Sequence, residues 1–404
     1  MRATESAELA ADGLVRQVRA DPVRREELVP LLREDHPLHD GRSAGTTARV
    51  RAWLLVAFAE VGVPEGALPY IVEELDSGDE PVLVAAAARG ALGLRGMDAP
   101  PAVVEAITTS LITALWNMAG RDDVVGFDEP VLSWPPEHPT TALQEVLAAL
   151  RDLAPPGAVA TRLAEFRTAK GELLSAAVRT SLDRTIADLT GGPACCSARR
   201  AAPPPETLPD AGPIPEGIKA EDQDGKRLDL AHFLSRAPTL LTFFYTRCGN
   251  PRKCSQTVSS LAALARELDA LGLLGTVQVA AVTYDPGYDT AARLRRYGLD
   301  RSLSFGPSVR MLRTPDGYAR LREHLELRVG HAGSVVNRHA VELFLLDDGR
   351  VARCWTRYLW DAAAVLPHIR DVVASHPPDR SRPTPCSALE VQGPTSGSTR
   401  WTTR

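Results

Sequence analysis

The sequence predicts a chain of two fold classes, an all-α domain over residues 1–190 followed by an α/β domain over residues 216–375. Three observations lead to this prediction. Residues 1–190 contain a series of apolar segments at helical spacing and no alternating β-pattern. The composition then changes abruptly to glycine and proline. Beyond residue 216, apolar runs typical of buried strands alternate with amphipathic segments, which is the pattern of an α/β domain.

The N-terminal half is expected to consist of helices joined by short turns. Trp53 and Phe58 lie on the apolar face of the first of them, and Gly62 and Pro64 end it. Pairs of such helices recur at roughly forty-residue spacing, which resembles a HEAT-like α-solenoid, with an irregular helical bundle as the alternative. No strands are expected here. The predicted helices are Thr47–Val61, Gly66–Leu75, Pro81–Leu94, Pro101–Met118, Thr140–Leu153, Gly157–Lys170 and Leu173–Leu189.

Two segments are expected to lie outside both domains. Residues 191–215 are rich in glycine and proline, which predicts a linker rather than a helix or a central strand. This linker contains adjacent cysteines, Cys195 and Cys196, which are either auxiliary thiol ligands on a tether or incidental linker residues. Residues 376–404 are rich in Pro, Ser, Thr and Gly and are expected to form a disordered tail.

Composition excludes several classes of function. The 404-residue chain has a formal net charge of -5 and no basic stripe with interleaved aromatic residues, so we expect no nucleic-acid partner. Its six cysteines are too few and too scattered for a secreted disulfide framework. The N-terminus lacks the apolar region of a signal peptide, and no membrane anchor is detected. A cytoplasmic location is therefore predicted, although an upstream leader would make the protein extracytoplasmic.

The α/β domain is predicted to follow the order β-β-α-β-α-α-β-β-α, with parallel central strands and a terminal antiparallel hairpin. A small hairpin turning at Asp224 and Gly225 and a helical turn at His232–Ser235 come first. Asp289 is expected to cap the helix that follows it. The later elements are a strand at Leu240–Tyr245, a helix at Val258–Leu273, a strand at Val277–Tyr284, a helix at Thr290–Tyr297, a helix formed by Met311 and Pro315–Leu325, strands at His339–Asp347 and Val351–Tyr358, and a helix at Trp360–Ser375.

Two cysteines, Cys248 and Cys254, follow the first buried strand and precede a helix. A thiol at a helix start is drawn toward the thiolate form by the helix dipole and by nearby cations, here Arg247, Arg252 and Lys253. A polar loop of this kind is expected to leave both thiols accessible. Thiolates attack disulfides or bind soft metals, so both kinds of chemistry are open at this point.

The motifs of the second domain resemble the Sco/SenC family of thioredoxin-like copper proteins, which help to assemble the copper centre of cytochrome oxidase. The resemblance lies in an aromatic-Tyr-Thr-x-Cys loop, a T-x-D-P-x-x-D-T segment, and a histidine just before a strand that ends in L-x-D-x-x-G. The matching residues, in this order, are Phe244 to Cys248, Thr283 to Pro286 with Asp289 and Thr290, and His339 with Leu345 to Gly349.

This resemblance implies that Cys248, Cys254 and His339 bind one copper ion, in a metallochaperone or redox-sensing role. Two thiolates and an imidazole suit soft Cu(I) and can also hold Cu(II). The sequence departs from the family in the spacing of its cysteines, because five residues rather than three separate them, and in the missing membrane anchor. Asp285 and Asp289 are expected to shape the loop beneath the site rather than to bind metal.

Two other functions remain open from the sequence. Cys248 and Cys254 could serve a thiol–disulfide oxidoreductase or a peroxiredoxin-like enzyme, with Arg338 or Arg247 as the arginine that a peroxidase needs. The position where oxidoreductases of the thioredoxin-like fold carry a cis-proline instead reads Val-Asn-Arg, at residues 336–338. Alternatively, the helical repeats form a scaffold for a protein client, and the thioredoxin-like domain regulates it.

Overall fold

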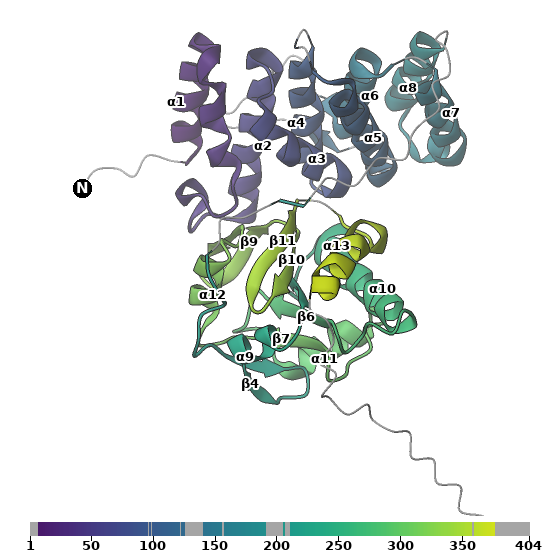
Figure 1. The fold of residues 1–404 in the computed structure, drawn as a ribbon. Coiled ribbons are helices and arrows are strands. Elements are labelled where there is room, and N and C mark those ends of the chain that lie inside the picture. Colours follow the sequence, from purple (N-terminus) through teal and green to yellow (C-terminus); the bar gives the residue numbers. More distant parts are fainter. Residues whose placement is uncertain are drawn as a thin grey trace, which may run out of the picture.

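The computed structural model describes residues 7–95, 97, 99–121, 123–125, 140–155, 157–190, 205–206, 211–357 and 359–375. A row of helices, the helical domain, lies against an α/β domain built around a single sheet (Figure 1). Cys195, Cys196 and the predicted tail at residues 376–404 fall outside the described residues.

The predicted helices of the N-terminal half are confirmed, and the described residues add one α-helix, several short 3-10 helices and one strand pair. The unpredicted helix, α1, buries Ala11, Val15 and Val18 on one face. A short antiparallel pair, β1 (Val124–Val125) with β2 (Thr140–Thr141), corrects the expectation of no strands, because these β-branched residues pair across the ends of a connection. The helices are α1 (Ala7–Ala20), α2 (Ala44–Val61), α3 (Leu68–Ser77), α4 (Pro81–Ala91), α5 (Pro101–Met118), α6 (Ala142–Leu153), α7 (Ala158–Lys170) and α8 (Ala176–Leu189).

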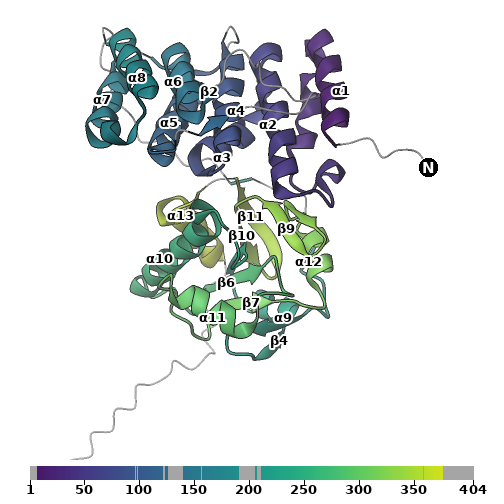
Figure 2. The same cartoon turned by 180° about the vertical axis from the view of Figure 1, so that it is seen from behind.

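These helices pack in two layers, which are visible from both sides (Figures 1 and 2). Helices α2, α4, α6 and α8 contact one another in series, while α3 packs on α5 and α5 on α7. Ala85 to Ala88 of α4 are fully buried, and their small side chains let neighbouring helices approach closely. Among the described residues, every helix is too short or too polar to span a membrane.

Gly90 of α4 lies close to the backbone of a neighbouring helix. A Cβ atom there would lie 2.3 Å from the backbone oxygen of Leu55 in α2. We therefore expect Gly90→Ala to lower the free energy of unfolding by about 1–3 kcal/mol, as overpacking does. Gly13→Ala is the matched control, because a Cβ at this helical glycine meets nothing within 4 Å. It should raise stability by about 0.5–1 kcal/mol through helix propensity. Urea unfolding followed by circular dichroism measures both, and equal effects would contradict the prediction.

The α/β domain contains a seven-stranded mixed sheet in the order β11-β10-β5-β6-β7-β3-β4. The three central strands, β5, β6 and β7, are parallel, and the outer four pair antiparallel. Parallel central strands and an antiparallel terminal hairpin, β10 with β11, were predicted, and the arrangement is consistent with a thioredoxin-like domain. All side chains of β5 and β6 are buried. The strands are β3 (Lys219–Asp222), β4 (Arg227–Asp229), β5 (Thr239–Phe244), β6 (Gln278–Thr283), β7 (Val309–Arg313), β10 (Glu342–Asp347) and β11 (Arg350–Thr356).

Helices cover both faces of this sheet. Apolar residues of α10, α11 and α13 form one hydrophobic core with the sheet, and those of α9 and α12 belong to a second core on the other face. The carboxyl ends of β5 and β6 therefore meet at one open edge, which is the edge nearest the helical domain (Figure 1). The helices are α9 (Leu230–Ser235), α10 (Gln256–Ala270), α11 (Ala291–Leu299), α12 (Tyr318–His324) and α13 (Ala362–Ser375).

Three local predictions in this domain were wrong. Met311 lies in strand β7 rather than in a helix, because its buried side chain alternates with the partly exposed Arg310. Thr290, not Asp289, caps α11, since the Thr290 side chain accepts a hydrogen bond from the backbone N–H of Arg293. His339 ends a separate strand, β9 (Val335–His339), which pairs with β8 (Val329–Ala332) rather than opening β10.

Candidate metal centre

Cys248, Cys254 and His339 converge at the open edge of the sheet. The Nε2 atom of His339 lies 3.4 Å from the Cys248 sulfur and 3.5 Å from the Cys254 sulfur. One donor atom from each residue lies within 4.8 Å of the other two, which is close enough for all three to hold one ion. These are the three residues that the sequence motifs brought together, and the structure places them in one cluster.

The two cysteines occupy different environments. Cys248 follows β5 in a turn and is partly exposed, whereas Cys254 is 1% exposed. Residues Pro251–Ser255 form a π-helical turn that leads directly into α10, and this winding carries Cys254 into the core beside Val258. The expectation that a polar loop leaves both thiols accessible is therefore wrong for Cys254. Both cysteines are free thiols.

His339 is oriented by its neighbours so that Nε2 faces the sulfurs. Its Nδ1 lies 2.8 Å from the carbonyl oxygen of Ala340, and since a carbonyl only accepts, Nδ1 carries the proton. The Nε2 lone pair is then available for a metal, an arrangement typical of metal-binding histidines. The rings of Tyr245 and Tyr284 each lie 5.4 Å from the imidazole and restrict its rotation.

The two thiols also differ in their electrostatics. Hydrogen bonding to the Cys254 thiol lowers the pKa of Cys248 to about 3. Burial raises the pKa of Cys254 well above its ordinary value. The pair therefore comprises one thiolate that accepts a hydrogen bond from one buried thiol. The flanking cations predicted to activate the cysteines are not the main cause, since Arg247 pairs with Asp285 and Lys253 with Glu73.

Asp285 and Asp289 support the loop, as expected from the sequence. The Oδ2 atom of Asp285 accepts a hydrogen bond from Nε of Arg247 at 3.1 Å. The fully buried Asp289 accepts from the backbone N–H of Thr246 at 3.1 Å and from the hydroxyl of Thr283. These contacts tie the segment before Cys248 to the end of β6.

The segment between the two cysteines contacts the helical domain. The Asn250 side-chain amide donates to the backbone oxygen of Ser77 at 2.7 Å, and Arg252 donates to that of Gly78 at 3.0 Å. The ammonium of Lys253 lies 2.6 Å from a carboxylate oxygen of Glu73 and donates to the backbone oxygen of His339 at 3.1 Å. The residues of the five-residue gap therefore join the candidate ligands Cys248 and Cys254 to the C-terminal end of α3.

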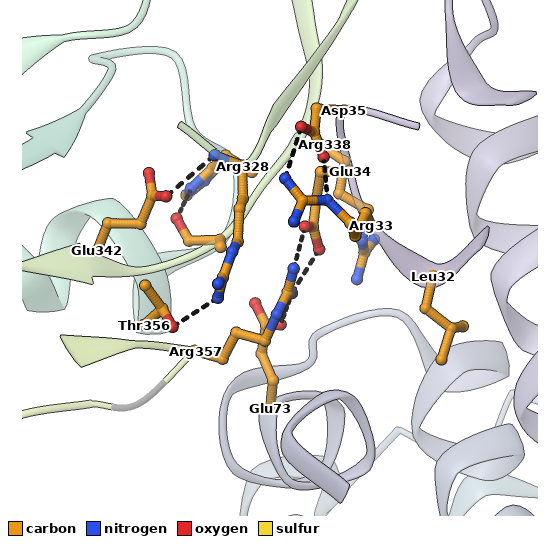
Figure 3. Close-up of polar contacts among 12 residues, drawn as sticks. Leu32, Arg33, Glu34, Asp35, Glu73, Arg328, Arg338, Glu342, Thr356 and Arg357 are labelled. Atoms are coloured by element: carbon orange, nitrogen blue, oxygen red, sulfur yellow. Dashed lines mark hydrogen bonds and ion pairs between the residues drawn. The ribbon is translucent and has the colours of Figure 1, made fainter. Parts of the chain in front are cut away.

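A network of buried charges extends this contact. Arg357, after β11, lies between two carboxylates of the helical domain, Glu34 and Glu73 (Figure 3). Glu74 pairs with both Arg51 and Arg338. The network consists of Glu34, Arg51, Glu73, Glu74, Lys253, Arg338 and Arg357.

The sequence contains no local sign of this network. Glu73 and Glu74 occur in a helix with no indication that they are buried, and their partners in the α/β domain lie more than 170 residues away. The only signal in the sequence was the unusual length of the segment between the cysteines, which has no role in a self-contained α/β domain. That length is explained by its contact with the helical domain.

Glu342 provides a pH-dependent test of this edge of the sheet. Burial raises the pKa of Glu342 from 4.5 to about 6, although its carboxylate accepts hydrogen bonds from the Tyr284 hydroxyl at 2.7 Å and the Arg328 N–H at 3.0 Å. Because the pKa of Glu342 is higher in the folded than in the unfolded state, its protonated form stabilises the fold. This stabilisation is fully present below pH 4.5 and is lost as the pH rises through 6.

We therefore compare the free energy of unfolding of Glu342→Gln with that of the wild type at two pH values. Between pH 4.5 and pH 8, the difference should shift by about 2 kcal/mol in favour of the variant. The measurement is the free energy of unfolding at a series of pH values for both proteins. A pH profile that is the same in both would contradict the raised pKa.

Comparison with known proteins assigns a family to the α/β domain. Residues 218–373 match the family model SCO1/SenC. Similar solved structures include copper-bound ScoI of Arabidopsis thaliana, with 18% identity and a TM-score of 0.33, covering 41% of this chain and 98% of that one. Copper-bound ScoI of Bradyrhizobium japonicum shows 21% identity and a TM-score of 0.32, covering 40% and 98%.

Copper-bound Sco1 of yeast shows 21% identity and a TM-score of 0.32, covering 42% of this chain and 99% of that one. The search of curated proteins found no match. The sequence motifs, the cysteine–histidine cluster at the open sheet edge and the family model agree on one assignment. Residues 218–373 of this chain form a domain of the SCO1/SenC family.

Proposed function

We propose that this protein binds one copper ion through Cys248, Cys254 and His339 and acts as a metallochaperone or a redox sensor. The observation that carries the proposal is the convergence of two sulfurs and one imidazole nitrogen within 4.8 Å. The match of the domain to the SCO1/SenC family supports it. In a metallochaperone the copper is cargo, which the site accepts and later gives up.

The chemistry of the donors fits copper better than other biological metals. Thiolates and imidazole select soft or intermediate ions, whereas calcium and magnesium require oxygen ligands. Asp285 and Asp289, the nearby carboxylates, already accept hydrogen bonds from the loop. Structural zinc sites almost always take four protein ligands, and the cluster found among the described residues offers three.

Titration of the fully reduced protein with Cu(I) tests the proposal. We expect one equivalent to bind to the wild type, and Cys248→Ala, Cys254→Ala and His339→Ala each to lose stoichiometric binding. Cys354→Ala is the matched control, since Cys354 is a buried cysteine of β11 outside the cluster. If Cu(I) binding survived in the three site variants and vanished only without Cys195 and Cys196, the site would lie in the linker and the proposal would be lost.

The same thiols support a second candidate function, thiol–disulfide exchange. The Cys248 thiolate would attack a substrate disulfide, and Cys254 would then displace the mixed disulfide. The substrate gains two thiols, and the enzyme pair becomes a disulfide. The pairing of a partly exposed thiolate with a buried thiol favours this order of events. Reduction of insulin or peroxide by the reduced protein, without Cu(I) binding, would establish this function instead.

A peroxiredoxin-like reaction has less support from the site. Both arginines suggested for that role are held by carboxylates, Arg247 by Asp285 and Arg338 by Glu74 and Glu80. Either would have to leave its partner before it could bind a peroxide.

The helical domain supports a further proposal, that it is a HEAT-like solenoid that binds a protein client. The two layers of serially packed helices favour this architecture over an irregular bundle. The client and the cytoplasmic location are likewise proposals. Cross-linking of the full chain in cell extract, mapped to helix surfaces, would identify a client.

A further inference from the structure

The proposed copper site opens into a cavity that belongs to both domains. The cavity has a volume of about 240 Å³. Cys248 and His339 line it from the α/β domain, and Ala44, Glu74, Glu80 and Leu83 line it from the helical domain. Cys254 lies beneath, almost fully buried. The sulfur of Cys248 is therefore reached through a space whose other wall is the helical domain.

Hydrogen bonds, ion pairs and a close backbone approach join the two domains around this cavity. Asn250 and Arg252 bind the backbone at the end of α3, while Lys253 and Arg357 share the buried carboxylate of Glu73. At β8, a Cβ atom on Gly330 would lie 2.4 Å from the backbone oxygen of Glu34, so this strand lies directly against the helical domain. Separation of the domains would expose the whole set of buried charges.

The size of the cavity limits what can reach Cys248. Pockets that enclose drug-sized molecules measure about 300–1,000 Å³, so a cavity of this size suits a ligand no larger than a small thiol. A stable protein partner covers about 800 Å² of surface. The surface next to the site that such a partner would need is already covered by the helical domain.

We propose that the helical domain selects the copper source by size, so that the docked protein exchanges Cu(I) with a small thiol complex and excludes protein-borne copper. This inference rests on the proposed copper function. In the exchange, Cu(I) passes from the thiolates of the small complex to the two cysteines and the histidine. The proton of Cys254 leaves on a departing thiolate, and no electron is transferred.

The accessibility of Cys248 tests the proposal without copper. The reduced, metal-free chain is treated with N-ethylmaleimide or with a maleimide attached directly to a small folded protein, and labelling at Cys248 is followed by peptide mass spectrometry. If only a separated state populated to about 1% admits the large reagent, its labelling is about 100-fold slower. Val23→Cys supplies the reagent control, since Val23 is 86% exposed. The labelling rates at Cys248 are divided by those of the same reagents at Val23→Cys. If the two corrected rates are equal, the proposal is overturned.

Gly330→Ala provides a second test of the proposal, because it leaves the proposed metal ligands and the charged residues unchanged. Its Cβ would push against the backbone of Glu34, so we expect the large reagent to gain access to Cys248 by at least about tenfold. Gly306→Ala is the matched control, because a Cβ there meets nothing within 4 Å. Unchanged size selectivity in Gly330→Ala would also overturn the proposal.

Copper uptake completes the test. Uptake from Cu(I)–glutathione should be fast in the wild type, and uptake from Cu(I)-metallothionein should be about 100-fold slower and should accelerate in Gly330→Ala. Equal uptake rates overturn the proposal. If Cu(I) does not bind at all while labelling stays size-selective, the copper function fails, and the helical domain still excludes macromolecules from a reactive thiol.

Discussion

Arg357→Met is expected to lower the free energy of unfolding by about 3–5 kcal/mol, the usual cost of removing one partner from a buried ion pair. The Arg357 guanidinium is almost fully buried and lies 2.7 Å from a carboxylate oxygen of Glu34 and 2.7 Å from one of Glu73. Both glutamates are buried and ionised, because the pKa of Glu34 is lowered mainly by Arg357 and that of Glu73 by Lys253 and then Arg357. Methionine keeps much of the volume but removes the cation that both carboxylates contact.

Arg296→Met is the matched control for this prediction. Arg296 pairs with Asp300 at 3.3 Å, but both side chains are mostly exposed, so the loss should be at most about 1 kcal/mol. Chemical unfolding of the two variants and the wild type, monitored by circular dichroism, gives the comparison. Similar losses in both variants would mean that solvent reaches the Arg357 network and that its charges are not buried.

The clustering of Cys248, Cys254 and His339 could be predicted because it depends on local patterns and their order. The apolar run at Leu240–Tyr245 indicates a buried strand, and the polar residues after it place Cys248 at a sheet edge. His339 could be associated with the cysteines only through the order of three motifs, since nothing near it in the sequence indicates a metal ligand.

The surroundings of the site could not be predicted because they depend on contacts between distant segments. Glu73 lies 180 residues from Lys253 and 284 from Arg357, and a pair of glutamates in a helix is normally typical of a solvated face. The burial of Cys254 depends on a π-helical turn, which no residue pattern in Pro251–Ser255 distinguishes from an open loop. The buried charges arise from packing against a domain that the family model does not include, whereas Cys254 is buried in the core of the α/β domain itself.

The five residues between the cysteines have a different role in the full chain than in the α/β domain alone. Considered within the α/β domain alone, it lengthens the loop and removes geometry that would hold two ligands in place. In the full chain the same residues are fixed by Ser77, Gly78 and Glu73 of the helical domain. A shorter loop would hold the two cysteines in place by itself, whereas here contacts with the helical domain hold them.

Lys253→Met is therefore expected to weaken Cu(I) binding by about 10–100-fold, the range found when a residue that orients metal ligands is removed. Lys253 precedes Cys254 in the chain and donates to the backbone oxygen of His339 at 3.1 Å. It thus links two of the three ligands, while Glu73 fixes its ammonium from the helical domain. Affinity is measured by competition with a Cu(I) chelator, on protein shown by circular dichroism to be folded.

Two further variants test whether Lys253 acts by positioning the copper ligands or only through its positive charge. Lys219→Met removes an exposed lysine paired with Asp229 at the far edge of the sheet, and it should leave Cu(I) affinity unchanged. Glu73→Gln should weaken binding through the same link, so the double variant with Lys253→Met should lose less than the sum of the two single losses. Additive losses, or full affinity in Lys253→Met, would show that the α/β domain holds its ligands without the helical domain.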